Sequence, residues 1–355
     1  MTKYLITLKP VEDYFFGGEN TFRTNDDSYE VNYFARSNPY PQQTSLLGLL
    51  RYMLLVSNDA LPIGNHKKKA DALIGKNSFD PKEKENAQRF GVIQSVSPLY
   101  IYDTENRKFY RISLETENFE VNFSDNGTVI THSKKEFSPE ITEYDAKKHY
   151  GIILKDTDDN KLSFDKVFKE LKPRIGIDVD RSEDDDKKMY KQVFYTLNKP
   201  FVFAFFAGLD KKYSYDNSKG EKVKLKNKHI VFFGGEQKRF VFEAKPDVKE
   251  PVFSLINVPQ KGKTKFVLLS DALVDSKFMN EVDFMINETQ DFRTVKIAFD
   301  NKKFNKKNDV SIKFNLLKRG SVIYTGNSQV TRLEDCFEKY NNYTKIGFNK
   351  LLKIN

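Results

Sequence analysis

The sequence has 355 residues, of which 39% are hydrophobic and 31% are charged. This length is comfortable for two domains, and abundant Phe and Tyr can fill their cores. The mean hydropathy is −0.62, and no run approaches the roughly 18 apolar residues of a membrane-spanning helix. The first residues lack the apolar stretch of a signal peptide, and the single Cys336 excludes an internal disulfide framework and a Cys-based zinc cluster. Together these features predict a protein of the reducing cytoplasm with no membrane partner.

The net charge of +9 is unevenly distributed along the chain. Residues 1–195 contain 29 Lys and Arg against 32 Asp and Glu, whereas residues 196–355 contain 30 against 18. An excess of positive charge favours a polyanionic partner such as nucleic acid. A lysine-rich, solvated surface would give the same composition, so charge alone does not separate these two interpretations.

Short apolar runs predict several strands and one strong helix in the first half. Pro41 precedes a segment, residues 44–55, whose apolar residues cover nearly every side, so we expect a buried helix there. A long loop is expected before this helix, and a loop or short helices over residues 64–90. A shorter helix is predicted over residues 164–171. Strands are predicted over residues 4–8, 98–102, 108–114, 119–123, 128–131, 174–178 and 189–197.

The second half opens on an apolar run of strand length, residues 201–207. Residues 230–233 and 240–242 predict two strands joined by the tight loop Gly234-Gly235-Glu236. A final helix is expected over residues 331–340, where Thr331 lies three residues before Glu334, the spacing of a capping box. Further strands are predicted over residues 265–269, 295–299, 310–314, 321–324 and 345–354.

The order of these elements predicts an α+β fold, because strands and helices do not alternate regularly. A break at Leu197-Asn198-Lys199-Pro200 divides the chain into expected domains of residues 1–197 and 198–355. Each is long enough to contain a βαββαβ unit with loop and hairpin insertions.

Signatures of enzymes are scarce in the sequence. It has neither a Walker lysine motif nor a GxGxxG sequence after a strand. The four histidines, His66, His132, His149 and His229, lack neighbours at metal-ligand spacing, so we expect no metal site and no cofactor. The acidic run at residues 184–186 is better explained as a solvated loop than as a magnesium site. A metal-free ribonuclease would need a histidine for acid–base chemistry, and His66 and His132 are the candidates.

Glycine pairs and mixed aromatic and basic segments are more informative. Gly17-Gly18, Gly234-Gly235 and Gly347 interrupt strand-like runs, where glycine makes a tight turn or lets exposed N–H groups bind phosphate. Lys238-Arg239 follows the second pair and favours a phosphate contact there. Alternation of rings with Arg and Lys, as in Tyr33-Phe34-Ala35-Arg36, suits single-stranded RNA, although many of these rings will belong to the core.

Five segments stand out in chain order: residues 6–22 with Phe15-Phe16-Gly17, residues 41–51, Arg174-Ile175-Gly176-Ile177 with Met189-Tyr190 downstream, Gly234-Gly235-Glu236, and residues 319–324. In this order they resemble the RAMP protein family that forms the third subunit of type III-B CRISPR (Cmr) complexes. Each segment is weak alone, but together they span nearly the whole chain. The C-terminal glycine-rich loop usual in RAMP proteins is reduced here to Gly347-Phe348-Asn349.

The resemblance implies two ferredoxin-like (RRM-like) RAMP domains and a subunit that cuts no RNA. It implies binding of the repeat-derived 5′ tag of the crRNA, and docking against the large polymerase-like subunit and a backbone RAMP subunit, with target RNA an indirect partner. Unpaired N–H groups at the start of the helix near Thr44 suit phosphate, and Glu236 suits orientation of an arginine or acceptance from a base amine. The expected RNA-binding residues are Arg36, Gln42, Gln43, Thr44, Ser45, Arg51, Arg174, Gly234, Gly235, Lys238 and Arg239.

Two alternatives remain open from the sequence. One is a RAMP endoribonuclease that processes precursor crRNA, which would require a positioned general base such as His66 or His132. The other is a protein-interaction scaffold whose basic composition is incidental.

Overall fold

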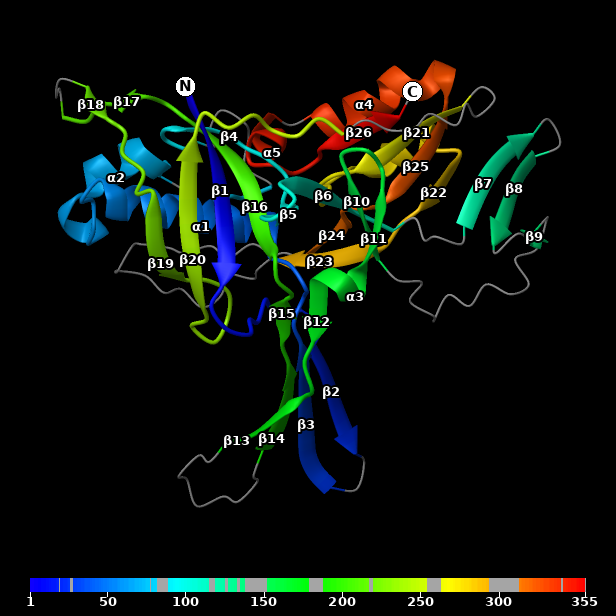
Figure 1. Ribbon diagram of the computed structural model, residues 1–355, viewed down its shortest axis with the longest axis horizontal. Helices are drawn as coiled ribbons and strands as arrows, with labels where there is room; N and C mark the ends of the chain where they lie inside the picture. The colour runs from blue at the N-terminus through cyan, green and yellow to red at the C-terminus, as the bar shows by residue number, and fades with distance from the viewer. Residues whose placement is uncertain are drawn as a thin grey trace.

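The structure is a computed structural model whose largest sheet is built around β1 (Thr2–Pro10) (Figure 1). β1 pairs antiparallel with β16 (Phe201–Leu209) on one side and with β20 (Arg239–Pro246) on the other. The described residues are 1–18, 20–25, 28–76, 78–81, 89–114, 119–124, 127–132, 135–137, 152–178, 188–216, 220–253, 263–293, 313–339 and 341–354.

This main sheet contains nine strands in the order β11-β10-β6-β5-β16-β1-β20-β19, with β4 also paired to β16. The domain boundary expected at residues 197 and 198 does not separate two sheets, because β16 and β20, from beyond the boundary, flank β1. The other strands are β4 (Ile93–Val96), β5 (Tyr100–Asp103), β6 (Lys108–Ser113), β10 (Ile153–Asp156), β11 (Lys161–Ser163) and β19 (Lys228–Phe232).

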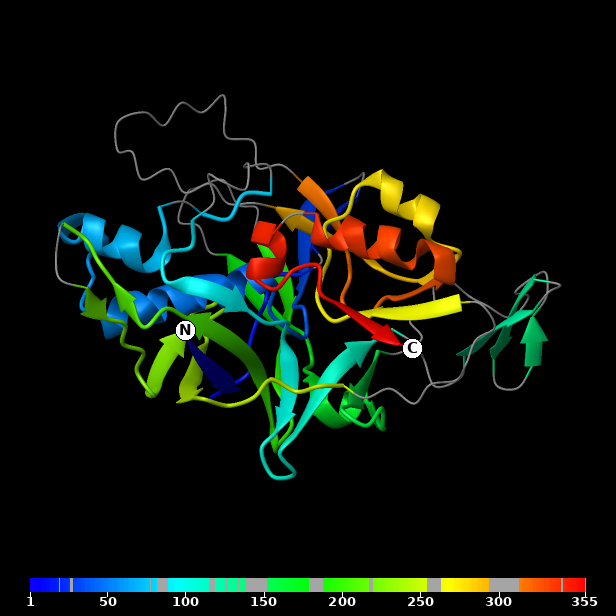
Figure 2. The same ribbon diagram turned by 90° about the horizontal axis from the view of Figure 1, so that it is seen from above.

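β16 is apolar throughout because both of its faces are buried. Phe203 and Phe205 point into the core beneath α1 (Gln43–Ser57) and α2 (Lys67–Ile74), which lie behind the sheet in Figure 1 and above it in Figure 2. Phe206 packs with Phe253 on the opposite face, where the chain crosses the sheet after β20. α1 confirms the predicted buried helix, and α2 with the 3-10 turn η1 (Ile63–Asn65) occupies part of the segment predicted as loop or short helices.

A second sheet, of four strands, is formed by the end of the chain in the order β22-β25-β21-β26. The helix α4 (Val330–Glu338) and the 3-10 segment η3 (Ser276–Glu281) cover one face, where Phe266, Ile323 and Phe337 are buried together. A two-stranded pair, β23 (Thr289–Arg293) with β24 (Lys313–Leu317), accompanies it. The strands are β21 (Lys263–Leu268), β22 (Phe284–Ile286), β25 (Val322–Gly326) and β26 (Leu351–Ile354), and the turn η4 (Asn327–Gln329) and helix α5 (Asn341–Lys345) complete this part.

An arm of four strands projects from the body, at the bottom of Figure 1. β3 (Ser28–Arg36) pairs antiparallel with β2 (Asn20–Asn25) and parallel with β14 (Lys188–Val193), which pairs with β13 (Arg174–Asp178). At its base lie β12 (Phe168–Glu170) and β15 (Tyr195–Leu197). The other small sheets are β7 (Phe119–Ser124), β8 (Gly127–His132) and β9 (Lys135–Phe137), and β17 (Lys212–Tyr213) with β18 (Glu221–Lys222).

Several sequence-based predictions differ from this structure. The helix expected over residues 164–171 is only one turn, α3 (Phe164–Val167), because buried Phe168 begins β12 and pairs with Leu197. The strand expected over residues 345–354 is confined to β26, because α5 ends at Lys345 and the buried side chains of Ile346 and Phe348 enter the main core. α4 is confirmed, but its N-cap is Gln329 without a side-chain cap, so the capping box at Thr331 is wrong. The loop expected before α1 contains β2 and β3, and the strands expected at 295–299 and most of 310–314 lie outside the described residues.

Candidate nucleic-acid interface

Two loops meet where the arm joins the body: the segment after β1 and the Gly234-Gly235 turn between β19 and β20. The backbone N–H of Gly235 donates to the carbonyl oxygen of Phe15 at 2.7 Å. Gly234 has a φ of +85°, and a Cβ there would lie 2.6 Å from the same oxygen, so only glycine fits. The Gly235 N–H, expected from the sequence to bind phosphate, is therefore already used to join the two loops.

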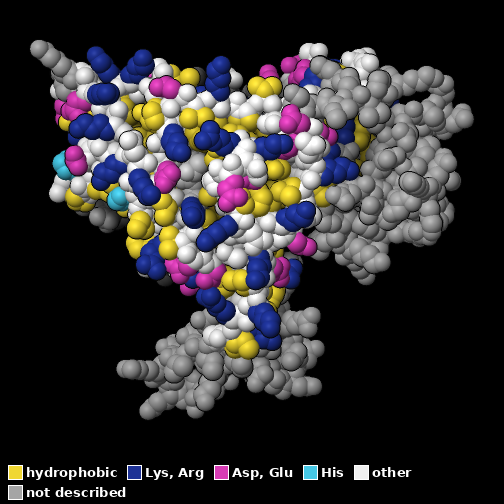
Figure 3. Space-filling model, in the orientation of Figure 1, with side chains coloured by type: hydrophobic (Ala, Val, Ile, Leu, Met, Phe, Trp, Pro, Cys, Tyr) yellow, Lys and Arg dark blue, Asp and Glu magenta, His cyan; other side chains and the backbone are white. Residues whose placement is uncertain are grey.

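Three of the expected basic residues come together at this junction, and two carboxylates lie between them. Arg174 Nη2 is 3.0 Å from Asp13 Oδ1, and Arg239 Nε is 3.3 Å from Glu12 Oε1. Buried Lys238 places its Nζ 3.4 Å from Asp13 Oδ2 and 3.6 Å from Glu12 Oε2. We call these five side chains the arm-base cluster; Figure 3 shows basic and acidic side chains gathered where the arm leaves the body.

Aromatic rings and hydrogen bonds fix the cations of the arm-base cluster. Arg174 lies over the ring of Phe194 at 4.6 Å, and Lys238 Nζ is 5.0 Å from the same ring centroid. The hydrogen bond from Arg239, together with the charge of Lys238, lowers the pKa of Glu12, so the pair stays ionised at neutral pH. The side chains of Arg174 and Arg239 remain 54% and 56% exposed. Two guanidinium groups are therefore held in place with free surface for an anion.

Arg36 and Glu236 lie at the same base of the arm. Arg36, at the end of β3, has its Nη2 3.5 Å from Glu170 Oε1, and Glu170 also accepts a hydrogen bond from Tyr195 at 2.7 Å. Burial and this hydrogen bond raise the pKa of the Tyr195 hydroxyl, which therefore acts as a donor. Exposed Glu236 accepts from Gln192 Nε2 at 3.4 Å, so its partner here is a glutamine rather than an arginine.

The expected RNA-binding residues at the start of α1 are half-buried, except for one that is fully buried. Gln42 is the N-cap residue and makes no side-chain cap, and Thr44 and Ser45 in the first turn are half-buried. Gln43 is fully buried, and its Nε2 donates to the carbonyl oxygen of Ser97 at 2.8 Å. The expectation that Gln43 contacts RNA is therefore corrected: its side chain joins α1 to the segment before β5.

Arg51 lies apart from the arm-base cluster. Its guanidinium carbon is 5.7 Å from the ring centroid of Phe90, and burial lowers its pKa to about 10.

Sequence reasoning missed Glu12, Asp13 and Phe194, which hold the arm-base cluster together. The signal for the first two was their position directly before the Tyr14-Phe15-Phe16 segment, although nothing in the sequence placed that segment beside Lys238.

The described residues contain no group of three or more His, Cys, Asp or Glu side chains arranged to hold a metal ion. Nor is any helix among them long and apolar enough to span a bilayer. Of the histidines, His66 is the exposed N-cap of α2 and His229 lies in β19, both outside the arm-base cluster. The side chain of His132 and all of His149 lie outside the described residues.

Comparisons with known proteins place this chain in a family. A search of curated proteins found no match, and the solved structures similar to this chain include the two that follow. A chain in a cryo-EM structure of the type III-B Cmr-beta bound to cognate target RNA and AMPPnP is 14% identical, with 98% of this chain and 96% of that chain covered and a TM-score of 0.46. A chain of the Csm3–Csm4 subcomplex in the type III-A CRISPR-Cas interference complex is 12% identical, with 92% and 97% covered and a TM-score of 0.33. The sequence matches the family described as CRISPR-associated protein (Cas_Cmr3) over residues 6–355, so the chain belongs to the Cas_Cmr3 family, as its ordered motifs predicted.

Proposed function

We propose that this chain is a non-catalytic RNA-holding subunit of a type III-B CRISPR effector complex. In this proposal it holds the repeat-derived 5′ tag of the crRNA and bridges the large polymerase-like subunit to the backbone. Membership of the Cas_Cmr3 family supports a place in such a complex. The observation that carries the RNA contact is the arm-base cluster, in which Arg174 and Arg239 are fixed by carboxylates yet more than half exposed.

The chemistry of the arm-base cluster favours holding over cutting. Its three cations and two carboxylates leave a local charge of +1, and guanidinium groups suit the phosphate oxygens and base edges of single-stranded RNA. The cluster, as the structure describes it, contains no histidine near neutral pKa that could act as general acid or base. The half-buried first turn of α1, with Thr44 and Ser45, offers further donors to a phosphate.

Strand order supports two ferredoxin-like halves within the proposal. In the main sheet β20, β1, β16 and β5 are neighbours in that order, and in the second sheet the order is β26, β21, β25 and β22. In both sets the first strand lies between the last and the third strands, as it does in a ferredoxin-like βαββαβ unit. Under this reading the halves divide between Phe253 and Lys263, rather than at residue 197.

A contact with another protein subunit is supported by the edge of the main sheet. β19 is the last strand of the described sheet, and its Ile230 and Phe232 are 63% and 67% exposed on the same side of the strand. Exposed Lys224, Lys226 and Lys228 precede or begin this strand. The apolar pair with basic neighbours suits an acidic edge on a neighbouring subunit.

The RNA contact is tested in the assembled complex, by measuring the crRNA that stays bound after washes of increasing salt. Arg239→Gln and Arg174→Gln should each weaken retention about tenfold, the loss expected for one charged hydrogen bond. Arg332→Gln is the matched control, because Arg332 on α4 is also exposed and paired, with Glu281 at 3.4 Å. Equal retention by all three variants would contradict the proposed contact.

The proposal that the chain does not cleave RNA is tested separately, by incubating the purified chain with repeat RNA in the absence of metal. No site-specific product is expected. A product that disappears in His66→Ala or His132→Ala would favour a processing endoribonuclease instead.

A further inference from the structure

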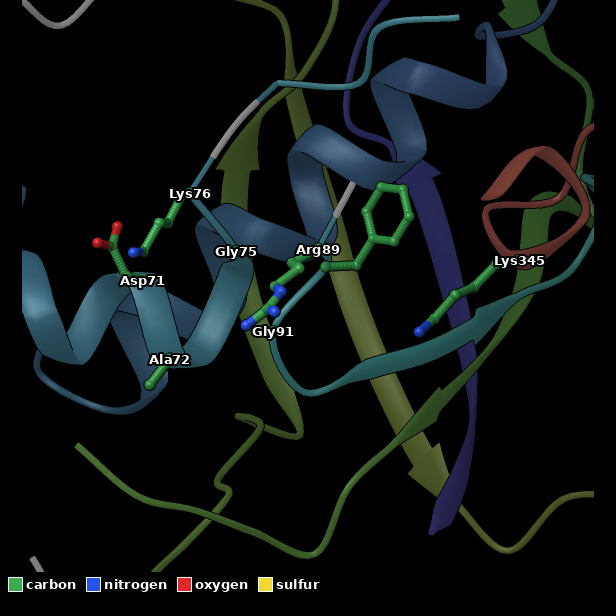
Figure 4. A pocket seen from close by; sticks show the side chains of 8 residues that line it. Asp71, Ala72, Gly75, Lys76, Arg89, Gly91 and Lys345 are labelled. Atoms are coloured by element: carbon green, nitrogen blue, oxygen red, sulfur yellow. The ribbon is translucent and has the colours of Figure 1, made fainter. Parts of the chain in front are cut away.

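A cavity of about 410 Å³ lies between α2, the segment that leads into β4, and α5 (Figure 4). It shares no residue with the arm-base cluster. Lys76 and Arg89 line it from the α2 side, and Lys345, the last residue of α5, reaches in from the other side. Elements of both halves of the chain therefore line the cavity. Its volume falls within the range of pockets that hold small organic ligands.

The side chains that line this cavity carry a positive net charge, with three cations against one carboxylate. Asp71 is the one carboxylate in the lining, and Lys76 extends toward it in Figure 4. Within the described part of the chain, no ion pair is formed by Lys76, Arg89 or Lys345. This differs from the arm-base cluster, where every cation has a carboxylate partner. Three cations without an ion-pair partner around one cavity attract an anion.

The backbone that forms the wall is fixed before any ligand arrives. Gly75, with a φ of +82°, is packed so closely against the carbonyl of Arg89 that a Cβ would overlap it. Val92 N–H donates to the Leu73 carbonyl at 3.0 Å, and Gly75 N–H donates to the Asp71 carbonyl at 3.0 Å. These bonds occupy two of the carbonyl oxygens at the C-terminal end of α2, which reduces the repulsion of an anion there. The side chains therefore set the charge of the cavity.

An aromatic ring forms part of the same cavity. Phe90 lines it, and two cations lie near its ring: the guanidinium carbon of Arg51 at 5.7 Å and Lys345 Nζ at 5.8 Å from the centroid. Arg51 keeps its proton at neutral pH, since its lowered pKa is still about 10. Phe90 is 3% exposed, so it gives the cavity a small apolar surface beside several donors, which suits a ligand with one apolar part and one anionic part.

We propose that this cavity binds a nucleotide through its phosphate, with Arg89 and Lys345 as phosphate ligands and Lys76 as an additional cation. The nucleotide is either one unit of an RNA strand or a free nucleoside monophosphate, which present the same phosphate and base. The proposal goes beyond the RNA contact at the arm base and stands without it.

Two measurements distinguish an RNA strand from a free nucleoside monophosphate as the source of the bound nucleotide. The isolated full-length chain is titrated with 5′-AMP by calorimetry, and the assembled complex is crosslinked with crRNA carrying 4-thiouridine, followed by mapping of the crosslinked peptide. Binding of 5′-AMP would assign a free nucleotide, and a crosslink to residues 89–91 would assign the strand. Arg89→Gln and Lys345→Gln should each reduce the signal roughly tenfold, the effect of one lost charged contact.

Lys353→Gln is the control for Lys345→Gln, because Lys353 is a lysine of the same half, half-exposed and 3.9 Å from Glu334. Lys76→Gln, at an exposed position, tests the cavity if either other variant fails to fold. The proposal is overturned if 5′-AMP does not bind and no crosslink reaches residues 89–91, or if the variants match the wild type in both measurements. Either result leaves the effect of Arg239→Gln on crRNA retention unchanged, so the two proposals fail separately.

Discussion

Arg319 and Asp271 form a fully buried, bidentate ion pair at the junction of the two sheets. Arg319 Nη2 is 2.9 Å from Asp271 Oδ2, Nε is 3.3 Å from Oδ1, and each side chain is 1% exposed. The same guanidinium donates to the carbonyl oxygen of Pro41 at 3.4 Å and lies 4.7 Å from the ring of Tyr40. Because Pro41 directly precedes the N-cap of α1, this pair connects the second sheet to the helix that covers the first.

Arg319→Met should destabilise the protein strongly, because it leaves the Asp271 carboxylate buried without its cation. Breaking a buried pair in this way costs about 3–5 kcal/mol, whereas replacing both partners by apolar residues is often close to neutral. The double variant Asp271→Leu/Arg319→Met should therefore be more stable than Arg319→Met alone. The free energy of unfolding, measured in urea, checks both statements. A loss below about 1 kcal/mol for the single variant would show that the pair is dispensable.

Gly234→Ala should also destabilise the fold, and Gly17→Ala provides a matched control in the facing loop. Alanine at position 234 would need a positive φ and would place its Cβ against the Phe15 carbonyl, a strain of about 1–3 kcal/mol. At Gly17 nothing lies within 4 Å of an added Cβ. Thermal unfolding of the two variants should therefore separate them, with a lower Tm for Gly234→Ala only. Equal Tm values would mean that the loop contact adapts.

Features that depend on local pattern could be predicted from the sequence. The apolar run from Phe201 to Ala207 and the broad apolar surface of α1 need only their neighbours in sequence to identify a buried strand and a buried helix. β2 and β3 pair with each other across a short turn, but they were missed because neither NTFRTN nor SYEVNYFAR contains a long apolar run. β3 also has a parallel partner, β14, more than 150 residues away. A strand whose partner is that distant leaves little trace in its own sequence.

The candidate site could likewise be predicted only in part from the sequence. The family resemblance selected Arg174, Lys238 and Arg239, and the structure brings them together, but their carboxylate partners Glu12 and Asp13 depend on how two distant loops dock. Gln43 was placed on the surface because polar side chains at the start of a helix are usually solvated. The end of the chain covers it instead: Gly347 approaches the Gln43 amide closely.

Gln43→Met tests this corrected role. The substitution keeps the volume but removes the donor to the Ser97 carbonyl, which should cost about 1–3 kcal/mol because the acceptor is buried. RNA retention by the folded complex should stay unchanged, since the side chain does not reach the surface. Urea unfolding and crRNA retention are measured on the same variant. Loss of RNA without loss of stability would return Gln43 to the RNA-binding surface.

Glu12→Gln should strengthen the binding of crRNA, the opposite of the effect expected for Arg239→Gln. Removing this carboxylate raises the charge of the arm-base cluster from +1 to +2 and releases Arg239 from its 3.3 Å contact. If the cluster holds RNA, one more cation is available to a phosphate, and the slope of log K against log salt should steepen by about 1. Salt-dependent dissociation of crRNA from the complex provides the slope. Glu334→Gln, which removes a carboxylate from the pair with Lys353, should leave the slope unchanged.

Asp156 gives a prediction for the dependence of stability on pH. Burial acts to raise the pKa of its carboxyl group, but hydrogen bonds from Lys108 and Asn160 outweigh burial and lower the pKa below its ordinary value. A carboxyl group with a lowered folded-state pKa binds fewer protons when folded than when unfolded. Its stabilising contribution is therefore present above the unfolded pKa, about 3.9, and is lost as the pH falls through the folded pKa.

Asp156→Asn should accordingly be less stable than the wild type at pH 7, and this difference should shrink as the pH falls below about 4. Urea unfolding across that range provides the measurement. Asp158→Asn is the control, because its carboxylate is 66% exposed and lies 3.8 Å from Lys108 Nζ, a geometry in which an ion pair contributes little. A difference between Asp156→Asn and the wild type that stays constant with pH would show that the asparagine disturbs packing rather than charge.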